Sequence, residues 1–123
     1  MAKILVVDDD SQIIELLKIA LERTGHEVDT ARSGQEAIDS ARSGRPALIL
    51  LDLVMPDMTG REVLEQIRSD PDLAQTPVVL ATGEVGADSD LDVMAVLTKP
   101  YKLDALYQVV EQAALSGGRE AGQ

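Results

Sequence analysis

The sequence predicts an α/β fold in which a doubly wound parallel sheet carries helices on both faces. Apolar runs of strand length alternate with segments whose apolar residues recur with the period of a helix. Most of the apolar runs are followed directly by polar residues. The length of 123 residues and the hydrophobic content of 45% suit one compact domain. We expect that domain to span residues 1–115.

The first predicted element is a short, continuous apolar run over residues 3–7, which is typical of a buried parallel strand. We predict that Ser11 caps the following helix and that Gly25 ends it. The apolar face of this helix is predicted to include Ile13, Leu17, Ala20 and Leu21.

The next elements are two strands separated by one helix. Residues 27–31 are predicted to form a second, weaker strand. The Ser-Gly pair at 33–34 opens a helix, and the segment 44–46 breaks it. The third strand covers residues 47–51, is wholly apolar and leads directly into Asp52.

The second half of the chain repeats the alternation. A loop at 55–60 precedes a helix that ends before Pro71, and strands are predicted at 77–81 and 93–97. A last helix follows, and residues 116–123 are predicted to form a flexible tail or the start of a linker. The apolar positions of the two helices are Val63, Leu64 and Ile67 in the first and Leu103, Leu106, Tyr107 and Val110 in the second.

Composition excludes several classes of function. A net charge of −11 disfavours direct binding to nucleic acid or to anionic membranes. Because no apolar run approaches the length of a bilayer span, we expect no membrane segment. The chain has no cysteine, so it has neither disulfides nor thiolate metal sites. A cytoplasmic location is the default expectation.

Polar residues stand at the ends of four predicted strands. Asp8 and Asp9 follow the first, Asp52 the third, Thr82 the fourth, and Lys99 the fifth. The carboxyl ends of parallel strands meet at one edge of the sheet, which is where such folds place their functional groups. We therefore expect these five side chains to surround one site, with Asp52 accessible to solvent.

The expected cluster suits phosphoryl chemistry. Three neighbouring carboxylates repel one another unless a cation intervenes, and Mg²⁺ prefers a few carboxylates together with water and phosphate oxygens. Lys99 offers a second cation and Thr82 offers a hydroxyl donor. A carboxylate such as that of Asp52 can act as the nucleophile and form an acyl phosphate.

Each residue also has a simpler interpretation. The acids at 8–10 could only cap the helix near Ser11, and Thr82 could only satisfy a turn. Lys99 could be an ordinary surface lysine. The single histidine, His26, lacks a nearby ligand pattern and is interpreted as a surface residue.

The motifs resemble those of a known family over about residues 3–115. The sequence is similar to the receiver domains of two-component response regulators, which have a CheY-like, flavodoxin-like fold of five strand–helix units with strand order 2-1-3-4-5. The matching segments are Ile4-Leu5-Val6-Val7-Asp8-Asp9-Asp10, Leu50-Leu51-Asp52-Leu53-Val54-Met55-Pro56-Asp57-Met58-Thr59-Gly60, the run 77–83, and Thr98-Lys99-Pro100-Tyr101.

The resemblance implies a role for each site residue. Asp52 corresponds to the phosphoacceptor, and Lys99 to the lysine that pairs with the phosphoryl group. Thr82 corresponds to the switch hydroxyl. The Mg²⁺ site would comprise Asp8, Asp9, Asp52 and the backbone carbonyl of Val54, with Asp9 and Asp52 as the more direct ligands.

The sequence also departs from the usual receiver pattern. Val96 occupies the position at which most receivers carry an aromatic residue. The interval from Thr82 to Lys99 is short and rich in Gly and Asp, which predicts a short or distorted helix between the fourth and fifth strands. The segment 80–83, Leu-Ala-Thr-Gly, resembles the Phe-Ala-Thr-Gly signature of an atypical receiver subgroup.

The leading hypothesis is a phosphorylation switch. The donor implied by the resemblance is a histidine kinase or a histidine phosphotransfer protein, and the recipient of the signal is a downstream output protein or domain. We expect a monomer, or a dimer that depends on phosphorylation, which catalyses only its own phosphorylation and dephosphorylation. The alternatives are an aspartate-based phosphohydrolase and a docking module of the same fold that takes no phosphate.

Overall fold

A computed structural model of the chain describes residues 3–52, 57–82, 93, 95–98 and 102–121. They form one five-stranded sheet in the order β2-β1-β3-β4-β5, and every neighbouring pair of strands is parallel. This confirms the predicted fold class and strand order. The elements are β1 (Lys3–Val7), α1 (Ser11–Arg23), β2 (Glu27–Ala31), α2 (Gly34–Gly44), β3 (Leu48–Asp52), α3 (Gly60–Ser69), β4 (Val78–Thr82), β5 (Ala95–Thr98) and α4 (Leu103–Ala121).

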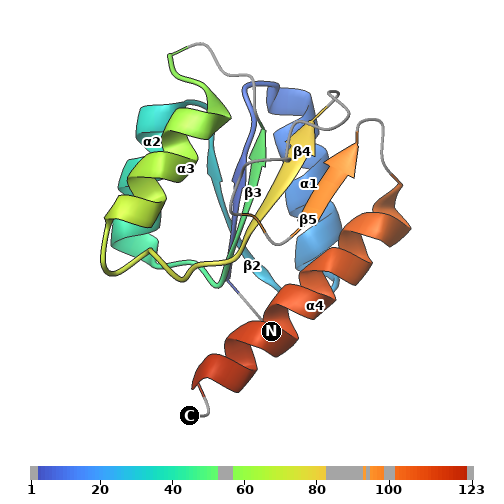
Figure 1. The fold of residues 1–123 in the computed structure, drawn as a ribbon. Helices are drawn as coiled ribbons and strands as arrows, with labels where there is room; N and C mark the ends of the chain where they lie inside the picture. The colour runs from blue at the N-terminus through green and yellow to red at the C-terminus, as the bar shows by residue number, and fades with distance from the viewer. Residues whose placement is uncertain (1–2, 53–56, 83–92, 94, 99–101, 122–123) are drawn as a thin grey trace.

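The helices cover both faces of the sheet, with α2 and α3 on one side and α1 and α4 on the other (Figure 1). Successive side chains of a strand point to opposite faces. In β1, Leu5 and Val7 therefore pack with α2 and α3, whereas Ile4 and Val6 pack with α1 and α4. Because both faces are covered, the central strands β1, β3 and β4 are mainly apolar, as expected for a parallel sheet, whereas the edge strand β2 also carries Glu27 and Asp29.

The start of α1 differs from the prediction. Its N-cap is Asp10, whose carboxylate accepts hydrogen bonds from the backbone N–H groups of Gln12 and Ile13, at 2.9 Å and 3.4 Å. Ser11, the predicted cap, is the first helical residue instead. Asp and Ser are comparable N-caps, so the sequence alone could not choose between adjacent candidates.

The buried face of α1 is also shifted from the prediction at one position. Ile14 is buried beside Leu17, Ala20 and Leu21, whereas Ile13 is only partly buried. Both positions satisfy a helical period with Leu17, at spacings of three and four residues. The angle at which α1 packs on the sheet decides between them.

α2 begins as predicted, whereas α3 begins at Gly60, the last residue of the predicted loop. Ser33 caps α2 by accepting a hydrogen bond from the N–H of Glu36 at 3.2 Å. Thr59 caps α3 through a reciprocal capping box with Glu62. The end of α2 is marked by Arg45, which takes the left-handed conformation with φ of 48°.

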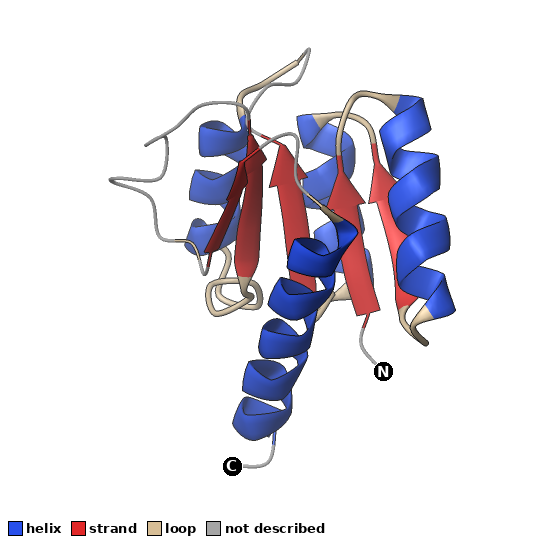
Figure 2. Ribbon diagram, turned by 90° about the vertical axis from the view of Figure 1, so that its right-hand side faces the viewer, coloured by secondary structure: helices blue, strands red, loops and turns tan. Residues whose placement is uncertain are grey.

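The last three strands end later than predicted, by one residue each. Asp52, Thr82 and Thr98 are therefore the final residues of β3, β4 and β5 rather than loop residues. Pairing uses backbone N–H and C=O groups, so it can include a polar residue at the end of an apolar run. All strand arrowheads lie at the same edge of the sheet in Figure 2.

Helix α4 continues to Ala121, so residues 116–121 are helical where we expected a flexible tail. Two glycines in this stretch cost about 1 kcal/mol each relative to alanine, which is too little to force an established helix to end. The predicted short helix between β4 and β5 lies in residues 83–92, outside the described part of the chain. Among the helices described, none combines the length and apolar composition needed to cross a membrane.

Candidate functional site

The register of the sheet brings the predicted acids together. Val7 of β1 pairs with Leu51 of β3, so the residues that follow them in the chain, Asp8 and Asp52, stand at the same level of the two neighbouring strand ends. Oxygen atoms of Asp8, Asp9 and Asp52 lie within 4.8 Å of one another. The predicted carboxylate cluster is therefore present, built from the ends of two adjacent strands.

The three acids differ in burial. Asp8 and Asp52 are buried, with 4% and 7% of their surface exposed, whereas Asp9 is exposed. We expected Asp52 to be accessible to solvent, and the structure corrects this expectation. Asp52 is the last residue of β3, a central strand that has β1 on one side and β4 on the other. Approach to Asp52 is limited to a small part of its surface.

The simpler interpretation, in which these acids only cap a helix, holds for Asp10. Asp10 faces the first turn of α1, as described above. Asp8 instead has one carboxylate oxygen that accepts a hydrogen bond from the N–H of Asp10 at 2.9 Å. Its own backbone N–H donates to the carbonyl of Ala31 in β2, at 3.1 Å. These bonds hold the backbone that presents Asp8 and Asp9 to the cluster.

The backbone register also relates Thr82 to the position of Lys99. Thr82 of β4 pairs with Thr98 of β5, the residue directly before Lys99 in the chain. Thr82 stands one position beyond Ala81, which pairs with Asp52. The side chain of Thr82, the whole of Lys99 and the carbonyl of Val54 lie outside what the structure describes.

The donor set of the cluster fits a hard divalent cation. Three carboxylate oxygens within 4.8 Å concentrate negative charge in a partly buried site. Mg²⁺ and Ca²⁺ favour oxygen ligands, and Mg²⁺ in particular combines one or two carboxylates with water and phosphate oxygens. The cluster offers such oxygens and, among the described residues, no softer ligand.

One residue with a specific contact was missed by the sequence interpretation. Asp57 accepts hydrogen bonds from the N–H groups of Gly34 at 2.8 Å and Gln35 at 3.1 Å, at the start of α2. These two donors, the Gly34 N–H foremost, lower the pKa of Asp57 below its ordinary value of 3.8. An acid in a loop after a buried strand is a weak signal, and only the fold shows which helix it reaches.

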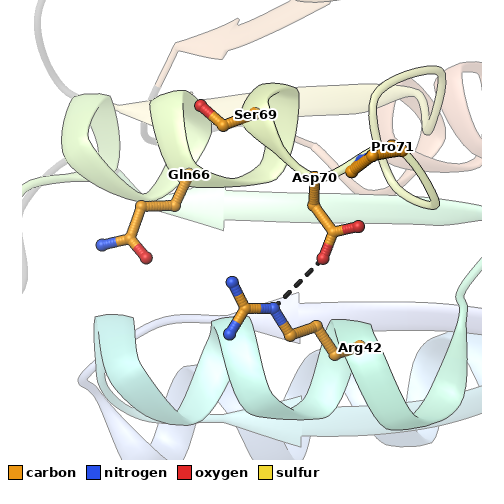
Figure 3. Close-up of a pocket in the computed structure, with 5 residues that line it drawn as sticks. All are labelled: Arg42, Gln66, Ser69, Asp70 and Pro71. Atoms are coloured by element: carbon orange, nitrogen blue, oxygen red, sulfur yellow. Dashed lines mark hydrogen bonds and ion pairs between the residues drawn. The ribbon is translucent and has the colours of Figure 1, made fainter.

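A surface hollow of about 370 Å³ lies away from the acidic cluster, between α2 and the end of α3 (Figure 3). Arg42 and Asp70 line it and form an ion pair with Nε and Oδ2 3.1 Å apart. The guanidinium is thus already neutralised by a neighbouring carboxylate. Neither residue belongs to the predicted site.

Comparison with known proteins places these features in a family. The pattern of the response regulator receiver domain matches residues 4–111. The chain is 37% identical over 110 residues to PhoP, the alkaline phosphatase synthesis transcriptional regulatory protein of Bacillus subtilis, covering 80% of this chain and 42% of PhoP. The chain spans about half the length of the curated relatives it matches.

Solved structures agree with this assignment. The response regulator TrrA of Thermotoga maritima, solved in complex with Mg²⁺-BeF, has 36% identity and a TM-score of 0.83, covering 92% of this chain and 99% of TrrA. The chemotaxis protein CheY4 of Vibrio cholerae has 30% identity and a TM-score of 0.85, covering 92% of this chain and 98% of CheY4. With the sheet order and the acid cluster described above, these matches show that the chain belongs to the response regulator receiver domain family.

Proposed function

We propose that Asp52 accepts a phosphoryl group from a phosphohistidine of a histidine kinase or histidine phosphotransfer protein, and that this modification switches the conformation of the domain. The observation that carries the proposal is the grouping of Asp8, Asp9 and Asp52 within 4.8 Å at the carboxyl ends of β1 and β3. In a chain of the receiver family, this cluster is the site at which such chemistry is expected.

The cluster would hold Mg²⁺ through Asp9 and Asp52, with Asp8 beside them and the backbone carbonyl of Val54 as a further ligand. When bound, the ion would neutralise charge on the phosphoryl oxygens. TrrA, the relative solved with Mg²⁺-BeF, supports this choice of ion. The whole protein is acidic, and the three carboxylates concentrate negative charge at this one site, where it attracts a cation.

Asp52 acts as the nucleophile in this proposal. One of its carboxylate oxygens forms a bond to phosphorus as the P–N bond of the phosphohistidine breaks, and the electron pair of that bond stays on the imidazole nitrogen. β1 and β4 flank β3 on both sides and fix the backbone of Asp52. Little further conformational entropy is therefore lost when the donor docks. Because only 7% of the Asp52 surface is exposed, the donor and water would reach it over a small area.

Lys99 and Thr82 complete the site in the proposal. The Lys99 ammonium would pair with one phosphoryl oxygen, and the Thr82 hydroxyl would donate to another. The register Thr82 to Thr98 supports their nearness, because it places the ends of β4 and β5 at one level. Movement of Thr82 toward the new phosphoryl group would shift the population of two conformations.

The partners follow from the same proposal. Relatives such as PhoP are transcriptional regulatory proteins longer than this chain, which supports an output domain or protein that reads the switch. The receiver itself would not contact nucleic acid, given its net charge of −11. We further propose a cytoplasmic location and a monomer, or a dimer that forms on phosphorylation.

The alternatives draw less support. A phosphohydrolase needs a general acid near its nucleophile, and the sequence supplies Val54 two residues after Asp52, the place where such an acid commonly stands. A docking module that takes no phosphate would have no need of three acids gathered around one strand end. Turnover of a generic phosphate ester would favour the hydrolase.

The test is labelling by acetyl phosphate, a small phosphoryl donor, in the presence of Mg²⁺. We expect wild type to gain the mass of one phosphoryl group, and to shift on a Phos-tag gel. Asp52→Asn and a sample with excess EDTA should remain unmodified. Asp39→Asn, on the exposed side of α2, is the matched control and should be labelled like wild type. Labelling of Asp52→Asn at the wild-type rate would refute the assignment, as would failure of wild type under conditions that label a known receiver.

A further inference from the structure

Arg32 lies at the same edge of the sheet as the acidic cluster of Asp8, Asp9 and Asp52. β2 is the outermost strand on this side of the sheet, and its last residue, Ala31, pairs with Val7 of β1. The next residues in the chain, Arg32 and Asp8, therefore stand at the same level of two neighbouring strand ends. The N–H of Asp8 donates to the carbonyl of Ala31 at 3.1 Å, which continues the pairing beyond the end of β1. Arg32 thus brings a positive charge to the rim of the cluster.

The backbone of Arg32 is held in place, and its side chain is exposed. The N–H of Arg32 donates to Oε2 of Glu36 at 3.4 Å, and the following residue, Ser33, caps α2. The Arg32 guanidinium forms no ion pair with any residue that the structure describes, whereas Arg42 is paired with Asp70. Arg32 therefore keeps its charge, reduced in effect only by the nearby Glu36 carboxylate, at a fixed point of the sheet edge.

A phosphoryl donor meets an unfavourable electric field as it approaches this protein. The net charge is −11, and three carboxylates lie within 4.8 Å of one another at the site itself. The phosphoryl group of a donor such as acetyl phosphate is a dianion near neutral pH, so the field repels it. A fixed positive charge near a site raises the local concentration of an anion and the rate at which it associates.

The charge of Arg32 is close enough to act on such an anion without touching it. Neighbouring strands lie about 4.8 Å apart, so the backbone of Arg32 is about 5 Å from that of Asp8 and about 10 Å from that of Asp52, two strands away. The Debye length is about 30 Å at an ionic strength of 0.01 M and about 3 Å at 1 M. The charge of Arg32 is therefore felt at Asp52 in dilute salt and is screened in concentrated salt.

We propose that Arg32 is a steering residue of the phosphoryl site, whose charge draws anionic phosphoryl donors toward Asp52 and at the same time opposes the binding of Mg²⁺ to the acidic cluster. The inference rests on the proposed function of Asp52 and adds a residue from a third strand end. The two effects have opposite signs because the donor and the ion carry opposite charges. A residue that only stabilised the fold would impair both processes together.

Three variants at position 32 separate charge from structure. Arg32→Gln removes the charge, Arg32→Glu reverses it and Arg32→Lys retains it. Arg23→Glu is the matched control, because it makes the same change in net charge at another exposed position. Arg23 is the last residue of α1, which leads from the carboxyl end of β1 to the start of β2, so it lies at the opposite edge of the sheet. The urea midpoint of each variant reports whether the fold is intact.

The experiment measures the rate of labelling by acetyl phosphate at a fixed Mg²⁺ concentration, and the Kd for Mg²⁺ by titration calorimetry. At low ionic strength we expect Arg32→Gln to slow labelling about 2- to 3-fold and Arg32→Glu about 5- to 8-fold. The same two variants should bind Mg²⁺ more tightly than wild type, by similar factors. Arg32→Lys and Arg23→Glu should stay within about twofold of wild type in both measurements. All differences should disappear at 1 M salt.

Several results would overturn this inference while leaving the proposed function intact. They are a wild-type labelling rate in Arg32→Glu at low ionic strength, a loss that persists at 1 M salt, weaker Mg²⁺ binding in Arg32→Glu, and an equal effect in Arg23→Glu. A wild-type protein that takes no phosphoryl group would overturn the proposed function, and this inference with it. Labelling of wild type therefore distinguishes the two failures.

Discussion

Replacing Asp52 by Asn should stabilise the metal-free protein. The oxygens of Asp52, Asp8 and Asp9 lie within 4.8 Å of one another. At that distance two unit charges repel by about 0.9 kcal/mol at a dielectric constant of 80 and by about 3.5 kcal/mol at 20. Asn keeps the shape and polarity of the side chain and removes its charge. Solvent around the exposed Asp9, and the proposed Lys99 ammonium, offset part of the repulsion, so we expect a net gain of about 1–3 kcal/mol.

Mg²⁺ should remove most of this difference in stability or reverse it. A ligand present at about 100 times its Kd stabilises the folded state by about 2.7 kcal/mol, and Asp52→Asn should lose most of that gain because a proposed ligand has become neutral. The assay is urea unfolding followed by far-UV circular dichroism, in EDTA and in Mg²⁺. The protein has no Trp, so fluorescence offers little signal.

Glu15→Gln is the matched control, because it removes one negative charge from the exposed face of α1. It should change stability by no more than about 0.5 kcal/mol in either buffer. The reasoning is refuted if Asp52→Asn is less stable than wild type in EDTA. It is refuted equally if Mg²⁺ stabilises the variant as strongly as it stabilises wild type.

Three further changes test the packing of the core and the contacts that Asp57 and Met58 make with the start of α2. Ile67→Ala empties a fully buried position under α3 and should cost about 2–5 kcal/mol in urea unfolding, whereas Leu16→Ala on the exposed side of α1 should cost far less. Gly34→Ala should destabilise by about 1–3 kcal/mol despite the higher helix propensity of alanine, because the new Cβ meets Met58; a thermal midpoint at or above that of wild type would contradict this. The lowered pKa of Asp57 means that its carboxylate stabilises the fold fully above the ordinary value of 3.8, and that this contribution disappears as the pH falls through the lowered value. The difference in thermal midpoint between wild type and Asp57→Asn should accordingly be present near neutral pH and vanish in acid; a constant difference across that range would exclude the ionised carboxylate as its source.

The sequence by itself determined the layered fold and the approximate place of the acids. Continuous apolar runs of strand length such as residues 4–7 and 48–51 favour strands buried on both faces, and such strands require helices on both sides. Parallel strands share one carboxyl edge, so an acid after β1 and an acid at the end of β3 had to approach each other. Local periodicity and chain direction were sufficient for these conclusions.

The tertiary structure alone decided which side chains are enclosed and which distant segments meet. The burial of Asp52 depends on the assembled fold, and the choice of Ile14 over Ile13 depends on how α1 packs. The bond from Asp57 to Gly34 spans 23 positions and involves backbone donors that every helix possesses. Sequence patterns encode the period of an element, but a contact between elements depends on their packing angle and separation, which many residues set together.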